Sequence, residues 1–265
     1  METNERLSVL ISSCDKFSDL WNENIRLYRK NWKNNTCRTV LVTDAKRDWQ
    51  SAEAELLSVD GENSFPLRIR CALERITTPY VLVTLDDYFL IDSVEDQKIS
   101  YLLDRMQQEK IQYLSLYNRR VTNEKKYLPL ETLLPIDLQK KYALTLYPAI
   151  WDVEFLKKTI REELSPWLYE VSLTQTAISE NANCQASLAG VFNILDVVRK
   201  GKVLHKARRY FKKNGIHIGD RPSISYWTEL KLWVFDMISW YAPRKLFRAG
   251  KKIAKKLGFQ FFSED

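Results

Sequence analysis

The sequence predicts an α/β fold with a mostly parallel central sheet and helices on both faces. Segments rich in β-branched residues alternate with segments of helical spacing up to residue 116, in the order β-α-β-α-β-α-β. This alternation is typical of a parallel sheet. Polar residues follow three of the predicted strands, and the carboxyl ends of parallel strands share one edge of the sheet. With 265 residues, the chain is expected to form one large domain or one domain with an appendage.

Local pattern predicts each element of the first half. Short runs of Val, Leu, Ile and Thr predict strands, and apolar residues three or four positions apart predict helices. Ser64 is the expected N-cap of one helix, with Pro66 in its first turn. The polar stretch 45–63 is expected to be a loop with a short helix near Glu53–Leu57. In order, the predicted elements are strand 7–12, helix 18–34, strand 39–43, helix 65–76, strand 80–85, helix 95–109 and strand 112–116.

Beyond Tyr117 the pattern becomes irregular. A strand is expected over 145–150 and a helix over 151–161. Segment 165–170 is aromatic and reads as irregular, before a helix at about 171–180. A last strand is expected over 193–198.

Composition excludes several function classes. The chain has seven glycines and contains neither GxGxxG nor GxxxxGK[ST], so dinucleotide-binding and P-loop sites lose their main support. The spacing of the four cysteines fits neither a zinc site nor a disulfide framework, and reduced thiols in a cytosolic protein are expected. The N-terminus lacks the order of a signal peptide, and no run of about 18 apolar residues predicts a membrane span.

Positive charge is concentrated in the last quarter of the chain. Residues 1–198 carry 24 Lys and Arg against 29 Asp and Glu, whereas residues 199–265 carry 17 against 5. The run 199–213 holds eight cations and no acid, which suits nucleic acid, phosphate-bearing ligands or a solvated helix face. The stretch 226–265 combines an apolar stripe with a Lys/Arg face, as in helices that lie in a membrane interface, although a packed helix pair is the alternative.

Two adjacent carboxylates end the most apolar predicted strand. Asp86 and Asp87 follow Tyr80–Leu85 directly, at the edge where ligands of open α/β sheets bind. A carboxylate pair suits Mg²⁺ or Mn²⁺, and such a cation suits a diphosphate. The alternative is a turn or helix cap with solvated acids. Asp44 and Ser12 end two other predicted strands, so a polar cleft is expected around the pair.

The segment Leu85-Asp-Asp-Tyr-Phe-Leu90, after Thr78-Pro-Tyr-Val-Leu, resembles the aspartate motif of GT-A-type glycosyltransferases. The resemblance is closest to a bacterial group, including galactofuranosyltransferase-like enzymes, that makes capsular, exopolysaccharide or O-antigen chains. Pro166-Trp-Leu-Tyr-Glu170 and Ala149-Ile-Trp-Asp-Val-Glu-Phe-Leu156 resemble later segments of these enzymes, in the same order. The resemblance covers roughly residues 7–221. It departs from the usual Asp-x-Asp pattern, because Tyr88 stands where the second aspartate would be.

The resemblance implies roles for particular residues. Glu170 would be the general base. Glu162 and Glu163 are the other candidates for this role. The alternative is that Glu170 is only a surface glutamate at the start of the following helix, where the helix dipole favours it. The remaining implied contacts are Ser12 and Asp44 near the nucleoside, Arg68 facing the diphosphate, Asp86 and Asp87 at the cation and diphosphate, and Asp87 with His217 as metal ligands.

The resemblance also implies a function. It indicates an inverting transferase with a nucleotide-diphosphate sugar donor and a divalent cation, Mn²⁺ or Mg²⁺. The donor is expected to be UDP-linked, with UDP-galactofuranose as one candidate. The expected acceptor is a lipid-linked glycan at an anionic membrane surface, on the cytoplasmic face of the bacterial plasma membrane. Residues 1–225 would form a GT-A-like catalytic domain, with a nucleotide-sugar half at 1–116 and an acceptor half at 117–225. The basic tail 226–265 would contact the membrane. No nucleic-acid partner is expected and the oligomeric state is open.

The alternative function is a non-catalytic module that uses the basic C-terminal quarter to bind a membrane or nucleic acid. It predicts salt-dependent binding to any polyanion, and it leaves Asp86 and Asp87 dispensable.

Overall fold

The structure is a computed structural model, which describes residues 2–60, 64–117, 127–140, 142–162 and 164–231. The chain divides into two compact units. The main unit is Met1–Asp196 with His217–Gly219, and the second unit is Val197–Ile216 with Asp220–Asp265. Most of the predicted tail 226–265 lies outside the described residues, so its helices stay a prediction.

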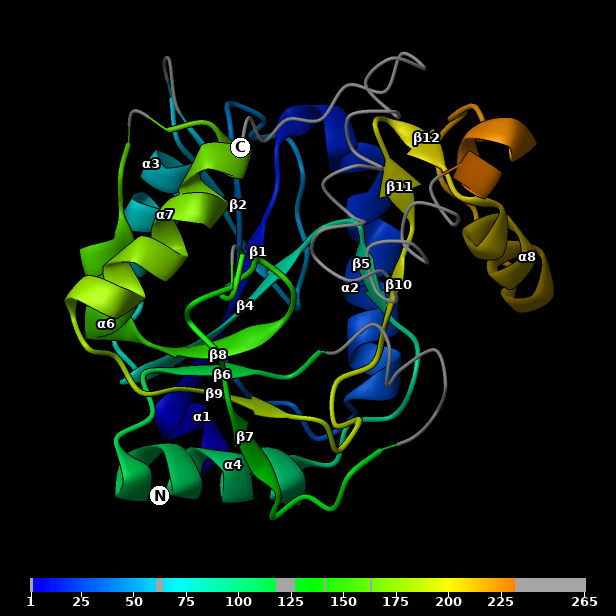
Figure 1. Cartoon of the computed structure of the whole chain (residues 1–265). Helices are drawn as coiled ribbons and strands as arrows, with labels where there is room; N and C mark the ends of the chain where they lie inside the picture. The colour runs from blue at the N-terminus through cyan, green and yellow to red at the C-terminus, as the bar shows by residue number, and fades with distance from the viewer. Residues whose placement is uncertain (1, 61–63, 118–126, 141, 163, 232–265) are drawn as a thin grey trace. The chain divides into compact units, whose positions relative to one another are not determined.

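The main unit is built on an eight-stranded sheet in the order β3-β2-β1-β4-β8-β6-β9-β7 (Figure 1). Four of its seven strand pairs are parallel: β1 with β2, β1 with β4, β2 with β3 and β6 with β9. The strands are β1 (Leu7–Ser12), β2 (Thr39–Thr43), β3 (Glu55–Ser58), β4 (Tyr80–Leu85), β6 (Tyr113–Ser115), β7 (Leu133–Pro135), β8 (Ala149–Asp152) and β9 (Cys184–Ser187).

Helices cover both faces of this sheet, as the alternation of elements predicted. Along β1, Leu7, Val9 and Ile11 pack into one core cluster, whereas Leu10 packs into the other. The first cluster includes residues of α2 (Ser18–Asn31) and α4 (Asp96–Glu109), and the second includes residues of α3 (Phe65–Leu73), α6 (Val153–Thr159) and α7 (Pro166–Ser179). Because side chains alternate along a strand, the central strands β1, β2, β4, β6 and β8 each supply both clusters.

Strand β8 runs antiparallel between β4 and β6 and decides what lies at the carboxyl edge of β4. Ala149, its first residue, lies opposite Val83, close to the end of β4. The residues just before β8 therefore reach the same edge as the acid pair. The predicted parallel alternation did not show this reversal, because a four-residue buried strand carries no signal of its direction.

Several predicted elements are corrected by the structure. Glu55–Ser58 forms strand β3 in parallel with β2, where a short helix near Glu53–Leu57 was expected. Residues 166–170 are the first turn of α7 and not an irregular segment, because Ser165 caps that helix by accepting from the N–H of Leu168. Four further short strands were not predicted: β5 (Tyr88–Leu90), β7, β9 and β12 (Lys202–Val203). The predicted Ser64 cap is confirmed, with Leu67 N donating to its hydroxyl at 3.2 Å.

Smaller elements complete the two units. The main unit also contains α1 (Thr3–Arg6), the 3₁₀ turn η1 (Asp15–Phe17) and β10 (Ile194–Asp196), which pairs antiparallel with β5. The second unit contains the hairpin of β11 (Val198–Arg199) and β12 (Lys202–Val203), followed by α8 (His205–Asn214). Among the described residues, no helix combines the length and the apolar character needed to cross a membrane.

Candidate functional site

The carboxyl ends of β1, β2 and β4 meet at one edge of the sheet, which we call the acid edge. It comprises Ser12–Asp15, Asp44, Asp86 and Asp87. Backbone bonds continue beyond the strands here, since Ser13 N donates to the Val42 carbonyl at 2.9 Å and Asp86 N donates to the Ser12 carbonyl at 3.3 Å. The predicted convergence of polar strand ends is therefore confirmed.

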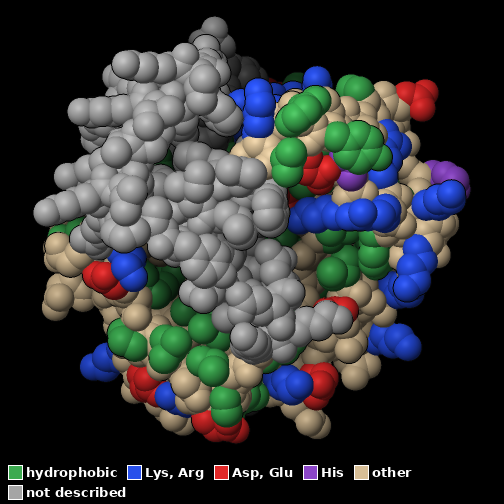
Figure 2. Space-filling view, turned by 45° about the vertical axis from the view of Figure 1, so that its right-hand side comes forward, with side chains coloured by type: hydrophobic (Ala, Val, Ile, Leu, Met, Phe, Trp, Pro, Cys, Tyr) green, Lys and Arg blue, Asp and Glu red, His purple; other side chains and the backbone are tan. Residues whose placement is uncertain are grey.

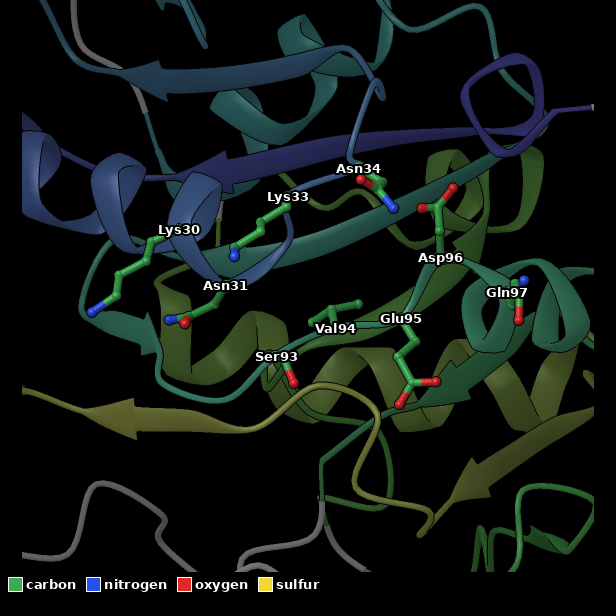
Figure 3. Close-up of a pocket in the computed structure, with 9 residues that line it drawn as sticks. All are labelled: Lys30, Asn31, Lys33, Asn34, Ser93, Val94, Glu95, Asp96 and Gln97. Carbon is green, nitrogen blue, oxygen red and sulfur yellow. The ribbon is translucent and has the colours of Figure 1, made fainter.

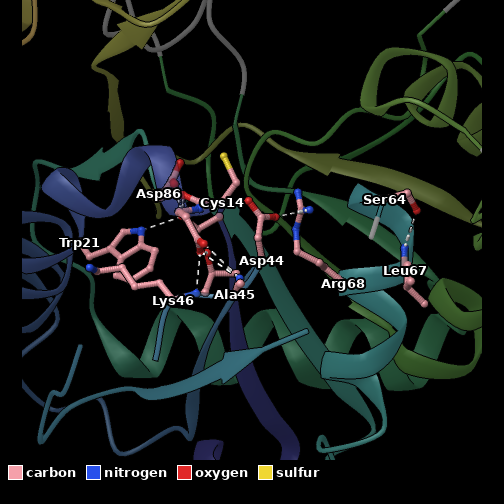
Figure 4. Close-up of polar contacts among 12 residues, drawn as sticks. Cys14, Trp21, Asp44, Ala45, Lys46, Ser64, Leu67, Arg68 and Asp86 are labelled. Atoms are coloured by element: carbon pink, nitrogen blue, oxygen red, sulfur yellow. Dashed lines mark hydrogen bonds and ion pairs between the residues drawn. The ribbon is translucent and has the colours of Figure 1, made fainter. Parts of the chain in front are cut away.

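Asp86 is held inside the protein on the side of α2. It is 5% exposed, and the Ser13 hydroxyl donates to its carboxylate. Trp21 of α2 donates its indole N–H to the same Ser13 hydroxyl oxygen at 2.6 Å (Figure 4). Asn24 donates to the Asp86 carbonyl at 2.9 Å. These contacts give Asp86 a role in anchoring the strand end. Asp87 is only half-buried.

Replacing Ser13 with alanine is expected to lower the free energy of unfolding by about 1–3 kcal/mol, because Asp86 and Trp21 each lose a buried hydrogen-bond partner. Urea denaturation followed by fluorescence measures this change. Ser93→Ala is a matched control at an exposed position, with an expected change within about 0.5 kcal/mol. Equal stability of Ser13→Ala and wild type would contradict the anchoring role of this network.

Asp44 and Arg68 form an ion pair on the side of α3. The guanidinium Nη1 of Arg68 lies 2.6 Å from Asp44 Oδ1, and the Arg68 side chain is only 10% exposed (Figure 4). Asp44 Oδ2 also accepts the N–H of Asp15 at 3.2 Å. The structure thus brings together two residues predicted separately, and it leaves the Asp44 side chain 35% exposed.

Asp15 fixes the loop that follows β2, a role that the sequence did not indicate. Its carboxylate accepts the Thr43 hydroxyl at 2.8 Å and the N–H groups of Ala45 and Lys46 at 3.1–3.2 Å. Burial by itself raises the pKa of Asp15, but the bonds from Lys46, Thr43 and Ala45 more than offset it, so the pKa lies below its usual value. In the sequence, the one feature that could have pointed to Asp15 is its position three residues after β1.

Cys14 lies where the acids of two strands approach each other. Burial, followed by the nearby charges of Asp86 and Asp44, raises the pKa of the Cys14 thiol to about 11. The thiol is therefore protonated at neutral pH, and its environment is dominated by carboxylates from β2 and β4. Ser12, two residues before Cys14, is 2% exposed, and its hydroxyl has no hydrogen-bond partner among the described residues.

Glu170 is held in the first turns of α7 by a segment that reaches the acid edge. Its Oε1 accepts the N–H of Leu146 at 3.0 Å, and Leu146 lies shortly before β8. Burial raises the pKa of Glu170, and the bond from Leu146 opposes part of that shift. A raised pKa suits a group that takes up a proton near neutral pH.

Three tyrosine rings connect the Glu170 segment to the acid pair. Tyr88 stacks on Tyr147 with ring centroids 5.2 Å apart, and Tyr147 stacks on Tyr117 at 4.8 Å. Burial raises the pKa of Tyr88 well above its usual value, with further contributions from Tyr147, Asp87, Asp196 and Glu170. The charges of Asp87 after β4, Asp196 of β10 and Glu170 of α7 therefore all act on Tyr88.

Asp196 is a further residue of this site that sequence reasoning missed. It is 7% exposed and lies directly opposite Tyr88 in the β5–β10 pair. Its position at the end of the predicted strand 193–198 was the available signal. Tyr147 had no signal of this kind, because its place at the edge depends on the direction of β8.

The other predicted site residues are placed as follows. Glu162 is paired with Arg70 at the surface, and Glu163 lies outside the described residues. Tyr169, which precedes Glu170 and is not one of the predicted site residues, is fully buried, and its hydroxyl lies 2.8 Å from that of Thr159, so it packs in the core. His217 is exposed and lies near Gly219, which packs against Asp19 in the first turn of α2.

The acid edge fits a divalent cation held by few protein ligands. The described residues contain no cluster of three or more His, Cys, Asp or Glu side chains arranged for a metal. Asp86 is already bonded to Ser13, whereas Asp87 is half-buried. Mg²⁺ sites commonly use one or two carboxylates and complete the shell with substrate phosphates and water. Metal binding by Asp87 and His217 stays a prediction.

One cavity of the main unit lies away from the acid edge. It has a volume of about 400 Å³ and is found at the C-terminal end of α2 and the start of α4 (Figure 3). Its lining mixes Lys30 and Lys33 with Glu95 and Asp96. Helix α2 begins at the acid edge, so its C-terminal end lies at the other side of the sheet. We assign no part of the candidate site to this cavity.

Comparison with known proteins establishes the fold. No protein-family model matches the sequence, and no curated protein matches it. Residues 1–349 of S. aureus TarS align with a TM-score of 0.50 and 13% identity, over 71% of this chain and 59% of that chain. The same TarS fragment in complex with UDP-GlcNAc aligns at 0.49 and 13%, over 75% and 60%. Mannosyltransferase PcManGT from Pyrobaculum calidifontis, in complex with GDP-Man and Mn²⁺, aligns at 0.48 and 15%, over 74% and 58%.

The likeness to TarS confirms the predicted α/β, GT-A-like fold. At 13% identity, this likeness supports the fold alone. This chain spans about three fifths of the length of the structures that it matches.

Proposed function

We propose that this chain is a glycosyltransferase that uses a nucleotide-diphosphate sugar as donor. One observation carries the proposal: Asp44, Asp86 and Asp87 converge with Arg68 at the carboxyl edge of a GT-A-like sheet, and the charges of both Asp87 and Glu170 act on Tyr88. In open α/β sheets this edge is where ligands bind. The sequence resemblance around Leu85–Leu90 supports the same class independently.

On the donor side, Asp87 holds the diphosphate together with a divalent cation, Mn²⁺ or Mg²⁺. Such a cation neutralises the charge that develops on the departing diphosphate. Arg68 adds a fixed positive charge near Asp44, and the 35% exposed Asp44 side chain faces the nucleoside, whereas the Ser12 side chain is buried beneath it. Asp86 supports this arrangement through Ser13. The donor class that we favour is a UDP-sugar, with UDP-galactofuranose as one member.

On the acceptor side, Glu170 removes the proton from the attacking hydroxyl. The hydroxyl oxygen forms a bond to the anomeric carbon while the bond from that carbon to the diphosphate breaks, and the electron pair leaves with UDP. Attack from the face opposite the leaving group inverts the configuration. The acceptor that we propose is a lipid-linked glycan of bacterial surface polysaccharide synthesis, reached on the cytoplasmic side of the membrane.

A thermal-shift screen with nucleotide sugars tests the donor. A ligand that binds the native state at 100 times its Kd raises the free energy of unfolding by about 2.7 kcal/mol, and the apparent melting temperature rises with it. We expect UDP-sugars, assayed with Mn²⁺, to raise the melting temperature more than the corresponding GDP- or CMP-sugars. No shift with any nucleotide sugar or with UDP would overturn the proposed function.

A further inference from the structure

The second unit presents a strongly basic surface. Residues 197–231 contain ten Lys and Arg against two Asp and Glu. This excess lies in the described part of the unit, before most of the predicted tail. None of these charged residues has a role in the proposed reaction.

Packing explains which cations remain exposed. Ala207 and Phe211 bury one face of α8, and Arg208 is committed to the Arg221 carbonyl and, at 3.1 Å, to the Ser223 hydroxyl. The other face of the helix presents Arg209, Lys212 and Lys213, and Lys202 of β12 is exposed as well. None of these four forms an ion pair with a residue that the structure describes. The exposed face of α8 formed by Arg209, Lys212 and Lys213 is called the basic face below.

Large apolar side chains are exposed in the same unit. Tyr226 is 77% exposed, Trp227 74% and Leu230 47%. The ring of Tyr226 stacks on His205, the first residue of α8, with centroids 3.8 Å apart, so this aromatic segment is attached to the start of the basic helix. Figure 2 shows Lys and Arg side chains around exposed hydrophobic side chains on the face of the molecule that carries α8.

We propose that the basic face and the Tyr226–Leu230 segment together form a docking surface for an anionic lipid bilayer. Each Lys or Arg near a membrane surface that carries anionic lipids adds about 1 kcal/mol of attraction. Trp and Tyr prefer the interface between headgroups and hydrocarbon, where their rings leave water and their polar atoms stay solvated. This surface contacts the membrane without requiring the stretch 232–265.

The aromatic segment favours a membrane over nucleic acid as the partner. Phosphate contacts to nucleic acid need cations alone, and stacking on bases needs aromatic rings within the basic groove. Here Trp227 and Leu230 are one aromatic and one aliphatic side chain, exposed three positions apart on one short helical segment. An aliphatic side chain has no base to stack on, but it inserts readily among acyl chains.

Vesicle flotation of the full chain tests this inference. The wild type is expected to float with vesicles of phosphatidylcholine and phosphatidylglycerol but much less with phosphatidylcholine alone, and added salt is expected to weaken binding. The triple variant Arg209→Glu, Lys212→Glu, Lys213→Glu is expected to lower the partition coefficient by at least about 100-fold. Trp227→Ser is expected to lower it by about tenfold while keeping the salt dependence.

A matched variant controls for net charge. Lys30→Glu, Lys33→Glu and Lys110→Glu change three exposed cations of the main unit in the same way and are expected to leave flotation unchanged. If the basic-face variant floated like wild type, or if both triple variants lost binding equally, this surface would not be the docking site. Capture by RNA or duplex DNA without flotation would show a nucleic-acid partner and overturn the proposal. Titration with UDP separates this outcome from failure of the proposed function, because the basic-face variant should bind UDP like wild type.

Discussion

The variant Asp87→Asn is expected to lose the metal-dependent part of UDP binding while it keeps its fold. Asp87 is the half-buried member of the acid pair, whereas Asp86 is 5% exposed and bonded to Ser13. Without a cation, a carboxylate repels a diphosphate, so Asp87 favours UDP only when a divalent cation lies between them. Isothermal titration with UDP, with and without Mn²⁺, measures this difference. We expect Mn²⁺ to tighten binding to wild type by at least about tenfold, or about 1.4 kcal/mol, and to have little effect on the variant.

Two comparisons make this experiment decisive. Glu74→Gln removes one exposed negative charge beside the start of β4, at the opposite edge of the sheet, and should behave like wild type. Asp86→Asn should instead lower stability, because Ser13 and Trp21 lose the charged acceptor at the end of their network. A wild-type response to Mn²⁺ in Asp87→Asn would remove Asp87 from the donor site. Absence of UDP binding to every variant and to wild type would end the proposal of a nucleotide-sugar enzyme.

The variant Glu170→Gln is expected to lose about 10²–10⁴-fold in turnover while UDP binding stays within about twofold of wild type. The amide cannot accept the proton of the acceptor hydroxyl, but its oxygen can still accept the N–H of Leu146. Steady-state release of UDP in the presence of acceptor measures turnover, and isothermal titration measures UDP binding. Glu74→Gln is again the matched control. Unchanged turnover would remove Glu170 from the mechanism.

The raised pKa of Glu170 determines how the activity and the stability of the wild type depend on pH. Because only the ionised carboxylate acts as base, the rate of wild type should fall with decreasing pH from a point above the ordinary Glu pKa of about 4.3. Burial raises the pKa in the folded state, so the protonated form is stabilised by folding. That stabilisation is complete below the unfolded-state pKa and is lost as the pH rises through the folded-state pKa.

Glu170→Gln is therefore expected to unfold at higher urea concentration than wild type at neutral pH, because the neutral amide avoids the burial of a charge. The difference should shrink as the pH falls below the ordinary pKa of Glu, where both side chains are neutral. Urea denaturation at neutral and at acidic pH measures both differences. A variant less stable than wild type at neutral pH would show that Glu170 holds the fold through its charge and would argue against a desolvated base.

The sequence predicted the elements whose signals are local. Strands β1, β2 and β4 were found at their observed bounds, because each is a run of β-branched and apolar residues that ends at polar ones. The Ser64 cap was found because capping depends on residues three positions apart. Strand β3 was missed because its pairing with β2, and not its own pattern, makes Glu55–Ser58 extended.

For the candidate site too, the sequence predicted what depends on local pattern and missed what depends on packing. Asp44, Asp86 and Asp87 were predicted to share an edge, because the carboxyl ends of consecutive parallel strands must do so. The sequence did not distinguish the roles of Asp86 and Asp87. That distinction depends on Ser13 and Trp21, which contact Asp86 only after α2 packs on the sheet. The pairing of Arg68 with Asp44 likewise depends on the packing of α3 beside β2.

The sequence by itself determined the α/β fold, the acid edge and the excess of cations in the last quarter of the chain, since these follow from periodicity, strand ends and composition. Only the tertiary structure decided that Glu170, Tyr147 and Asp196 lie around Tyr88. The physical reasons are the reversed strand β8, which begins at the edge where β4 ends, and the antiparallel pairing of β10 with β5. Contacts between residues so far apart in sequence form only when strands pair and helices pack, and no local pattern encodes the direction of a short buried strand.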